Sequence, residues 1–129
     1  MPDTGTRAKV LCVDDEHDQR MLLAFLLERQ GYEVRTAADG AEGVDIARKW
    51  LPDLILIDLM MPGVDGFRAT QTLRADPSTA SIPILALTAY GEEDMRIRAR
   101  ESGMDGFVLK TILPADLLDV VRKVLPPSD

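Results

Sequence analysis

Carboxylates follow two short apolar stretches of the sequence, at the point where each stretch ends. The segment Lys9–Val13 runs directly into Asp14-Asp15-Glu16, and the apolar run Leu54–Ile57 ends in Asp58. Two unit charges ~4 Å apart repel by about 4 kcal/mol at an effective dielectric constant of ~20, so clustered carboxylates need a cation. Capping of the next helix would account for one or two of them, and Asp58 alone could simply end a strand. Together they favour a site for a hard divalent cation such as Mg²⁺.

A hydroxyl and an ammonium group follow two further apolar stretches. Residues 84–87 end in Thr88, and residues 106–109 end in Lys110. A carboxylate such as Asp58 can accept a phosphoryl group and form an aspartyl-phosphate. The transferring group needs positive charge, which Mg²⁺ and Lys110 would supply, and Thr88 offers a hydroxyl to a phosphoryl oxygen. The sequence has no Gly-rich phosphate loop, so it does not predict nucleotide binding of the P-loop kind.

These residues need a scaffold that brings four segment ends together, and the hydrophobic pattern predicts one. We expect five strands in alternation with five helices, which is the pattern of an α/β domain with a mainly parallel sheet. The strands are expected at Lys9–Val13, Tyr32–Thr36, Leu54–Asp58, Ile84–Leu87 and Gly106–Leu109. The helices are expected at Asp18–Gln30, Ala41–Trp50, from an Asp65 cap to Ala75, at Glu92–Ser102 and from Pro114 to about Val124. Ligands of such sheets bind at the carboxyl ends of the strands, where all the chemically interesting residues lie.

Three expectations concern individual elements. The alternating pattern of Tyr32–Thr36 predicts a strand at a sheet edge. The apolar stripe of the first helix, which includes Met21-Leu22-Leu23-Ala24-Phe25, is wider than one buried face requires, and we assign the extra width to the core. The helix Glu92–Ser102 has the poorest apolar stripe, so it is expected to be anchored least firmly, with its arginines on a solvated face.

Composition narrows the class of protein. The chain has 129 residues, 46% hydrophobic and 29% charged, which is typical of one globular domain. Its net charge of -7 argues against a direct nucleic-acid surface and suits a protein that handles cations. The single Cys12 lies in an apolar run and is expected to be buried, without a disulfide. No run approaches the ~20 apolar residues of a membrane span, and no signal peptide is visible, which favours a cytoplasmic location.

Four separated segments resemble the receiver domain of two-component response regulators, the family of the chemotaxis regulators. They are Val13-Asp14-Asp15-Glu16, the stretch from Asp58-Leu59-Met60-Met61-Pro62 to Gly66, Thr88-Ala89-Tyr90, and Lys110. The resemblance runs from Lys9 to Leu125, so we expect a domain at 9–125, a flexible tail at 1–8, and a tail or linker start at 126–129. It implies a flavodoxin-like, doubly wound five-stranded parallel sheet with strand order 2-1-3-4-5.

The resemblance also implies a role for each site residue. Asp58 would accept a phosphoryl group from a histidine kinase or a histidine phosphotransfer protein. Asp14, Asp15, Asp58 and the backbone carbonyl of Met60 would hold Mg²⁺, with Mn²⁺ as the alternative ion. Lys110 and Thr88 would assist the reaction, and Thr88 and Tyr90 would switch the surface formed by the last two helices and the fifth strand.

One residue departs from the family pattern. The family commonly has proline after the lysine, whereas this chain has Thr111. A cis peptide bond costs about 3–4 kcal/mol before a residue other than proline, so we expect the Lys110–Thr111 bond to be trans.

Two other classes of protein remain as alternatives. A phosphatase of the haloacid-dehalogenase type also uses an aspartate nucleophile with Mg²⁺, but it usually has a second aspartate two residues later, where this chain has Met60. A pseudo-receiver is an interaction module without phosphorylation, but such chains lose the acceptor or the acidic pair. The output partner or domain, the kinase and the oligomeric state, monomer or weak dimer, are not predicted.

Overall fold

The computed structural model describes residues 7–89 and 91–125. Within them five strands and five helices alternate, and each expected element is present. The strands are β1 (Lys9–Val13), β2 (Glu33–Ala37), β3 (Leu54–Asp58), β4 (Ile84–Thr88) and β5 (Gly106–Leu109). The helices are α1 (His17–Glu28), α2 (Gly40–Trp50), α3 (Gly66–Ala75), α4 (Glu93–Ser102) and α5 (Pro114–Val124). The expected tails at the two ends fall mainly on residues outside the described ranges.

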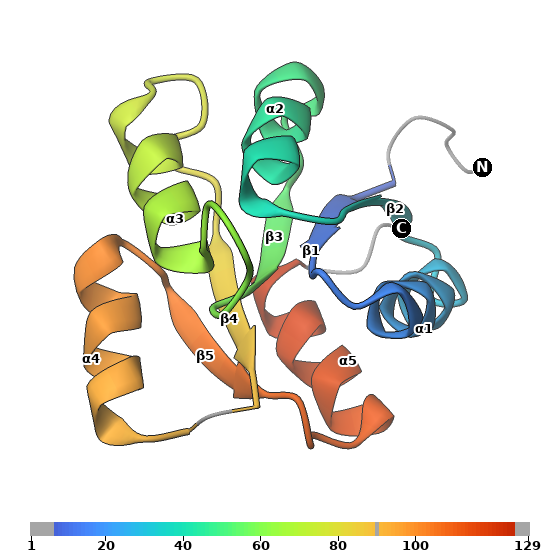
Figure 1. Cartoon of the computed structure of the whole chain (residues 1–129). Helices are drawn as coiled ribbons and strands as arrows, with labels where there is room; N and C mark the ends of the chain where they lie inside the picture. Colours follow the sequence, from blue (N-terminus) through green and yellow to red (C-terminus); the bar gives the residue numbers. More distant parts are fainter. Residues whose placement is uncertain (1–6, 90, 126–129) are drawn as a thin grey trace.

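The strands form one parallel sheet in the order β2-β1-β3-β4-β5, as expected (Figure 1). The alternating strand β2 lies at an edge, and β3 lies in the middle. Every residue of β3 and β4 is buried, because helices cover both faces of the sheet. The polar Asp58 and Thr88 are therefore held at the ends of two buried strands.

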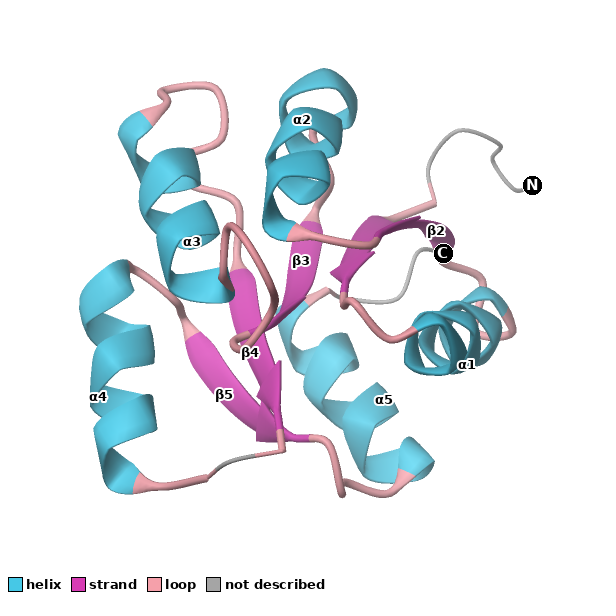
Figure 2. Ribbon diagram, in the orientation of Figure 1, coloured by secondary structure: helices cyan, strands magenta, loops and turns pink. Residues whose placement is uncertain are grey.

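The helices make the outer two layers of the sandwich (Figure 2). Helices α2, α3 and α4 pack on one face, where Trp50, Phe67 and Ala99 join one hydrophobic cluster. Helices α1 and α5 pack on the other, where Leu27 and Val121 join a second cluster. Such two-sided cover directs ligands away from the faces and towards the carboxyl edge of the sheet. Within the described residues no helix is both long and apolar enough to cross a bilayer.

The expectation that the whole apolar stripe of α1 lies in the core is wrong. Leu23 and Leu27 are buried, but Met21, Leu22 and Phe25 are exposed, Phe25 to 55%. A helix at the edge of the sheet can bury only one side, so the additional apolar residues face outward. Cys12, in contrast, is buried and free as expected, and burial raises the pKa of its thiol to about 12.

Helix α4 buries few and small side chains, as its poor apolar stripe predicts. Only Ala99 and Ser102 are buried in it. Its arginines, however, are not simply solvated: the Arg98 guanidinium lies 4.1 Å from the ring centroid of Phe67, and that of Arg96 lies 5.2 Å from that of Phe107. These cation–π contacts link α4 to α3 and β5 without burying an apolar stripe.

Candidate functional site

Asp58 ends the central strand, and the chain turns immediately behind it. The residue is 5% exposed, and its Oδ1 accepts a hydrogen bond of 3.3 Å from the Met60 amide. The Gly66 amide donates to the Leu59 carbonyl at 3.1 Å, which closes the loop between β3 and α3. The Asp65 side chain caps α3 as expected, by accepting from the Arg68 amide. The Asp58 carboxylate is therefore fixed by a short closed loop.

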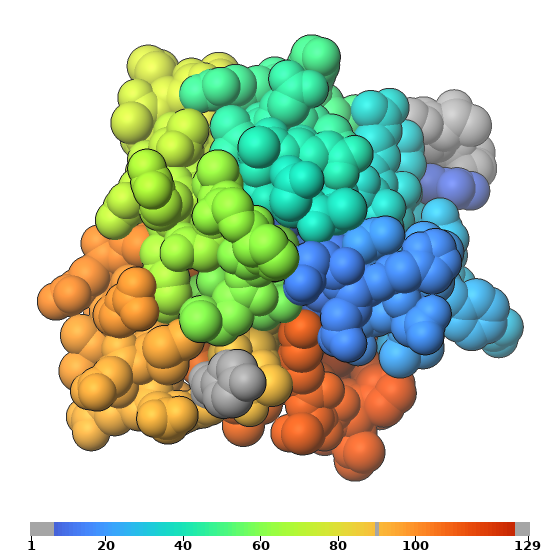
Figure 3. All heavy atoms as spheres, in the orientation of Figure 1, coloured from blue at the N-terminus to red at the C-terminus, as the bar shows by residue number. Residues whose placement is uncertain are grey.

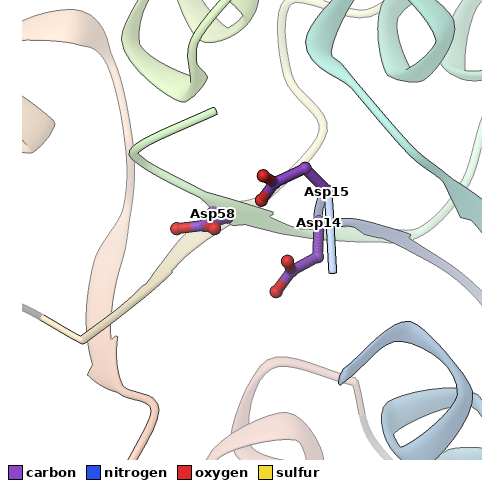
Figure 4. Close-up of side chains that lie close together, drawn as sticks. All are labelled: Asp14, Asp15 and Asp58. Carbon is purple, nitrogen blue, oxygen red and sulfur yellow. The ribbon is translucent and has the colours of Figure 1, made fainter. Parts of the chain in front are cut away.

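The acidic pair Asp14-Asp15 follows the neighbouring strand β1 and lies at the same edge of the sheet as Asp58. Val13 lies beside Ile57 in the parallel register, so Asp14 follows β1 where Asp58 ends β3. Asp14 is 1% exposed and Asp15 is exposed. Carboxylate oxygens of Asp14, Asp15 and Asp58 all lie within 4.8 Å of one another, as Figure 4 illustrates. In the space-filling view, the parts of the chain coloured blue, green and red-orange meet on the face turned towards the reader (Figure 3).

Helix capping does not explain the acidic cluster. The N-cap residue of α1 is Glu16, and its side chain makes no capping hydrogen bond. Asp14 Oδ1 instead accepts from the Glu16 amide at 2.9 Å, and the Arg20 guanidinium donates to the Asp14 carbonyl at 2.8 Å. These contacts fix the turn that carries Asp14 and leave the exposed Asp15 carboxylate available.

Lys110 supplies the cation of the cluster. Its Nζ lies 3.0 Å from Asp14 Oδ2, 3.1 Å from Asp58 Oδ2 and 3.7 Å from Glu16 Oε1. The Lys110 amide also donates to the Thr88 carbonyl at 2.7 Å, which positions the end of β5 against β4. The Lys110–Thr111 peptide bond is trans, so the prediction based on Thr111 is confirmed.

Burial and charge shift two pKa values in this cluster. Burial raises the pKa of Asp58 above its usual range; Lys110 pulls it down, and the Asp14 carboxylate adds to the increase. Burial acts to lower the pKa of Lys110, but the carboxylates of Asp14 and Asp58 more than offset it, so this pKa is raised. Lys110 is thus favoured in its charged form, while folding makes ionisation of Asp58 less favourable than in the unfolded chain, a cost that a further cation would offset.

The Asp58 shift predicts a stability change. Because its pKa is raised by folding, its contribution to stability is fully present below the pKa of the unfolded chain and is lost as pH rises through the folded pKa. In the absence of divalent ions, Asp58→Asn is therefore expected to be more stable than the parent at neutral pH, by about 1 kcal/mol or roughly 3–4 °C in Tm, because Lys110 keeps its ion pair with Asp14. Thermal unfolding from pH 7 towards pH 4 should show this difference shrinking. The exposed Asp45→Asn is the control, and a parent that is the more stable protein at neutral pH would contradict the explanation.

The donor set fits a hard divalent ion. It consists of carboxylate oxygens from two adjacent strand ends, and the buried Asp14 Oδ2 makes an ion pair with Lys110 but accepts no hydrogen bond. One ammonium does not balance three clustered carboxylates, so the cluster favours a further cation. Oxygen ligands of this kind, completed by water, are what Mg²⁺ prefers.

The other predicted site residues lie around this cluster. Thr88 ends β4 and is fully buried. Met60 follows the acceptor by two residues, with a side chain exposed to 53%. Tyr90, the second predicted switch residue, lies outside the described residues. The sequence reasoning missed Arg20, whose contact to a backbone carbonyl six residues away has no signature in the sequence.

The comparisons with known proteins agree with this geometry. The family model described as the response regulator receiver domain matches residues 10–122. PilH of Pseudomonas aeruginosa is 34% identical over 118 residues, which cover 92% of this chain and 98% of that protein. The DNA-binding dual master transcriptional regulator RpaA of Synechocystis sp. is 40% identical over 121 residues, 94% of this chain and 50% of that protein.

The structural comparison points the same way. The chemotaxis protein CheY4 of Vibrio cholerae superimposes with a TM-score of 0.89 at 35% identity, over 93% of this chain and 100% of that chain. The first curated relatives are longer, and this chain spans about half their length. The acidic cluster, the lysine and the strand order 2-1-3-4-5 thus have one explanation, and the chain belongs to the family of response regulator receiver domains.

Proposed function

We propose that Asp58 is the phosphoacceptor of this receiver domain and that it takes a phosphoryl group from a histidine kinase or a histidine phosphotransfer protein in a Mg²⁺-dependent reaction. One observation supports this above all. Three carboxylates converge within 4.8 Å at the carboxyl edge of the sheet, and the Lys110 ammonium contacts two of them. Because the acceptor, the acidic pair and the lysine are all present, an active receiver is favoured over a pseudo-receiver. Met60 at the second position after the acceptor disfavours the phosphatase alternative.

The reaction follows from the positions of the side chains. An Asp58 carboxylate oxygen attacks the phosphorus atom while the bond from phosphorus to the donor nitrogen breaks, and that nitrogen keeps the electron pair and takes up a proton. Asp14, Asp15, Asp58 and the Met60 carbonyl would hold the metal, which supplies positive charge to the phosphoryl oxygens when bound. Lys110 supplies a second positive charge through its contact with Asp58 Oδ2, and the Thr88 hydroxyl is the proposed donor to a phosphoryl oxygen.

The first test is metal dependence. The purified chain is expected to gain one phosphoryl group from acetyl phosphate in the presence of Mg²⁺ and none after removal of divalent ions with EDTA, because the clustered carboxylates otherwise repel the incoming anion. Intact-mass spectrometry measures the product, and Mn²⁺ is expected to replace Mg²⁺. An equal yield in EDTA would contradict the proposed metal role.

Phosphorylation is proposed to switch the surface of α4, β5 and α5. Thr88 is followed within five residues by α4, the helix that buries only Ala99 and Ser102. Both of these buried side chains are small, so drawing the Thr88 hydroxyl towards a phosphoryl group would act on a helix with little apolar anchoring. The change is a shift between two conformations of one fold, with Tyr90 as the second proposed switch residue.

The switch predicts where spectra change. Addition of beryllofluoride, a phosphoryl mimic, with Mg²⁺ should move backbone amide NMR signals of α4, β5 and α5 as well as those of the Asp58 loop. Signals of α2, on the other side of the sheet centre, should move less. Changes confined to the Asp58 loop would show that the acceptor is not coupled to α4.

The proposed partners follow from membership of the receiver-domain family and from the similar proteins. The domain would receive its signal from a histidine kinase or phosphotransfer protein and pass it to an output partner or output domain. The longer relatives include proteins named as transcriptional regulators, and PilH is a relative of nearly the same length as this chain. A cytoplasmic location and assistance by the domain in its own phosphorylation and dephosphorylation complete the proposal. No direct contact with nucleic acid or membrane is proposed for the domain, which would act as a monomer or weak dimer.

A further inference from the structure

The first residue of α2 lies against the loop that follows the acceptor. Gly40 is buried, and a Cβ atom built on it would fall on the carbonyl oxygen of Val64 and lie 2.9 Å from Val64 Cγ1. Gly40 precedes Asp58 by 18 residues and belongs to a different element. Only glycine allows this end of α2 to approach the loop so closely.

The end of α2 is held in place, so it cannot easily retreat from Val64. The Asp39 side chain accepts from the Glu42 amide at 2.8 Å, and Glu42 Oε1 accepts from the Ala38 amide at 2.7 Å. Such a reciprocal cap fixes the first turn of a helix. A side chain at position 40 would therefore displace Val64 rather than the helix.

The loop transmits such a displacement, because it is short and closed. Leu59 and Met61 are buried in the core, and the Gly66 amide bonds the Leu59 carbonyl at 3.1 Å. A Cβ on Gly66 would meet the Asp58 carbonyl oxygen and lie 3.0 Å from the Leu59 Cα atom, so α3 leaves the loop no room on its other side. Met60 lies inside this closed loop and is exposed, so a shift of the loop at Val64 is shared with the Met60 peptide.

We infer that Gly40 is a positioning residue of the metal site: by letting α2 support Val64, it holds the Met60 carbonyl at the position from which it contributes to Mg²⁺ binding. The inference rests on the proposed function, since it concerns the same site. Gly40 touches neither the acceptor nor the metal, and its effect passes through Val64 and the closed loop.

The test is Mg²⁺ affinity in Gly40→Ala, measured on the full chain by titration of backbone amide NMR signals. Alanine is the better helix former, so a purely local effect on α2 would stabilise the helix and leave the metal site alone. Displacement of Val64 instead predicts a Kd for Mg²⁺ raised about tenfold, the usual effect of losing a supporting contact behind a metal ligand. At saturating Mg²⁺ the rate of phosphorylation by acetyl phosphate should return to within about twofold of the parent, because Asp58 and Lys110 are unchanged.

The control is Ala41→Gly, which lowers helix propensity at the adjacent exposed position and should leave the Mg²⁺ Kd unchanged. Adding Val64→Gly to Gly40→Ala removes the Cγ1 contact and frees the peptide, and it should recover part of the lost affinity. If Gly40→Ala does not fold, Val64→Gly alone should still weaken Mg²⁺ binding. The inference is overturned if Gly40→Ala binds Mg²⁺ as tightly as the parent, or if Ala41→Gly weakens binding equally. A parent protein that binds Mg²⁺ but is never phosphorylated would instead refute the proposed function.

Discussion

Asp58→Asn is expected to abolish phosphorylation by both acetyl phosphate and a histidine phosphotransfer protein, with a loss of at least ~1,000-fold. The amide keeps the size of the carboxylate and can still accept from the Met60 amide, but it has no anionic oxygen to attack phosphorus. The same variant is expected to be the more stable protein without metal, so a failure to fold would not explain the loss. The yield of phosphoprotein is measured by intact-mass spectrometry after a timed reaction.

The matched control for this prediction is Asp53→Asn. Asp53 lies just before β3, at the opposite end from Asp58, and accepts a hydrogen bond of 2.8 Å from the Lys9 amide. This change alters the charge of the chain by the same amount without touching the site, so the yield of phosphoprotein should stay near that of the parent. An Asp58→Asn protein phosphorylated at an unchanged rate would place the acceptor elsewhere.

Lys110→Met is expected to have the second large effect, a loss of stability whose size depends on the metal. The substitution leaves Asp14 and Asp58, both buried, without their shared cation. Removing one partner of a buried ion pair typically costs about 3–5 kcal/mol, so Tm without divalent ions should fall by roughly 10 °C or more. The exposed Lys123→Met should change Tm little.

Mg²⁺ should restore much of the stability lost in Lys110→Met. Lys110 and the metal compete for the same carboxylates, so the variant is expected to bind Mg²⁺ more tightly than the parent. An ion present at 100 times its Kd stabilises the folded state by about 2.7 kcal/mol. Phosphorylation should nevertheless be slower by about 100-fold, because one positive charge beside the transferring group is missing. Weaker Mg²⁺ binding in the variant would show that Lys110 supports the metal site rather than competing with it.

The sequence predicts most of this fold because its signals are strong and local. A strand that is buried on both faces requires an uninterrupted apolar run, such as Leu54–Ile57. A strand with one exposed face alternates polar and apolar residues, and the alternating strand Glu33–Ala37 indeed lies at the edge of the sheet. The site was predictable from one geometric fact: in a parallel sheet, residues that follow different strands share an edge. Asp14, Asp58 and Lys110 therefore meet although they are far apart in the chain.

The remaining features depend on tertiary contacts that leave no pattern in the sequence. The apolar stripe of α1 looks like core, but the helix buries only one side, so Phe25 is exposed. Arg20 bonds a backbone carbonyl, which any residue at position 14 would offer. The arginines of α4 resemble a solvated face, and only the structure shows the ring of Phe67 beneath Arg98. Gly40 precedes the expected helix Ala41–Trp50, and no pattern in the sequence shows that Val64 lies against it.

The most direct test of the central claim is the location of the phosphoryl group in the parent protein. After phosphorylation by acetyl phosphate with Mg²⁺, reduction with borohydride converts an aspartyl-phosphate to homoserine, and tandem mass spectrometry locates the converted residue after tryptic digestion. The conversion is expected at Asp58, in the peptide that spans residues 50–68. Conversion at Asp14 or Asp15, a phosphoryl group on His17, or no conversion at all would contradict the assignment of Asp58 as the acceptor.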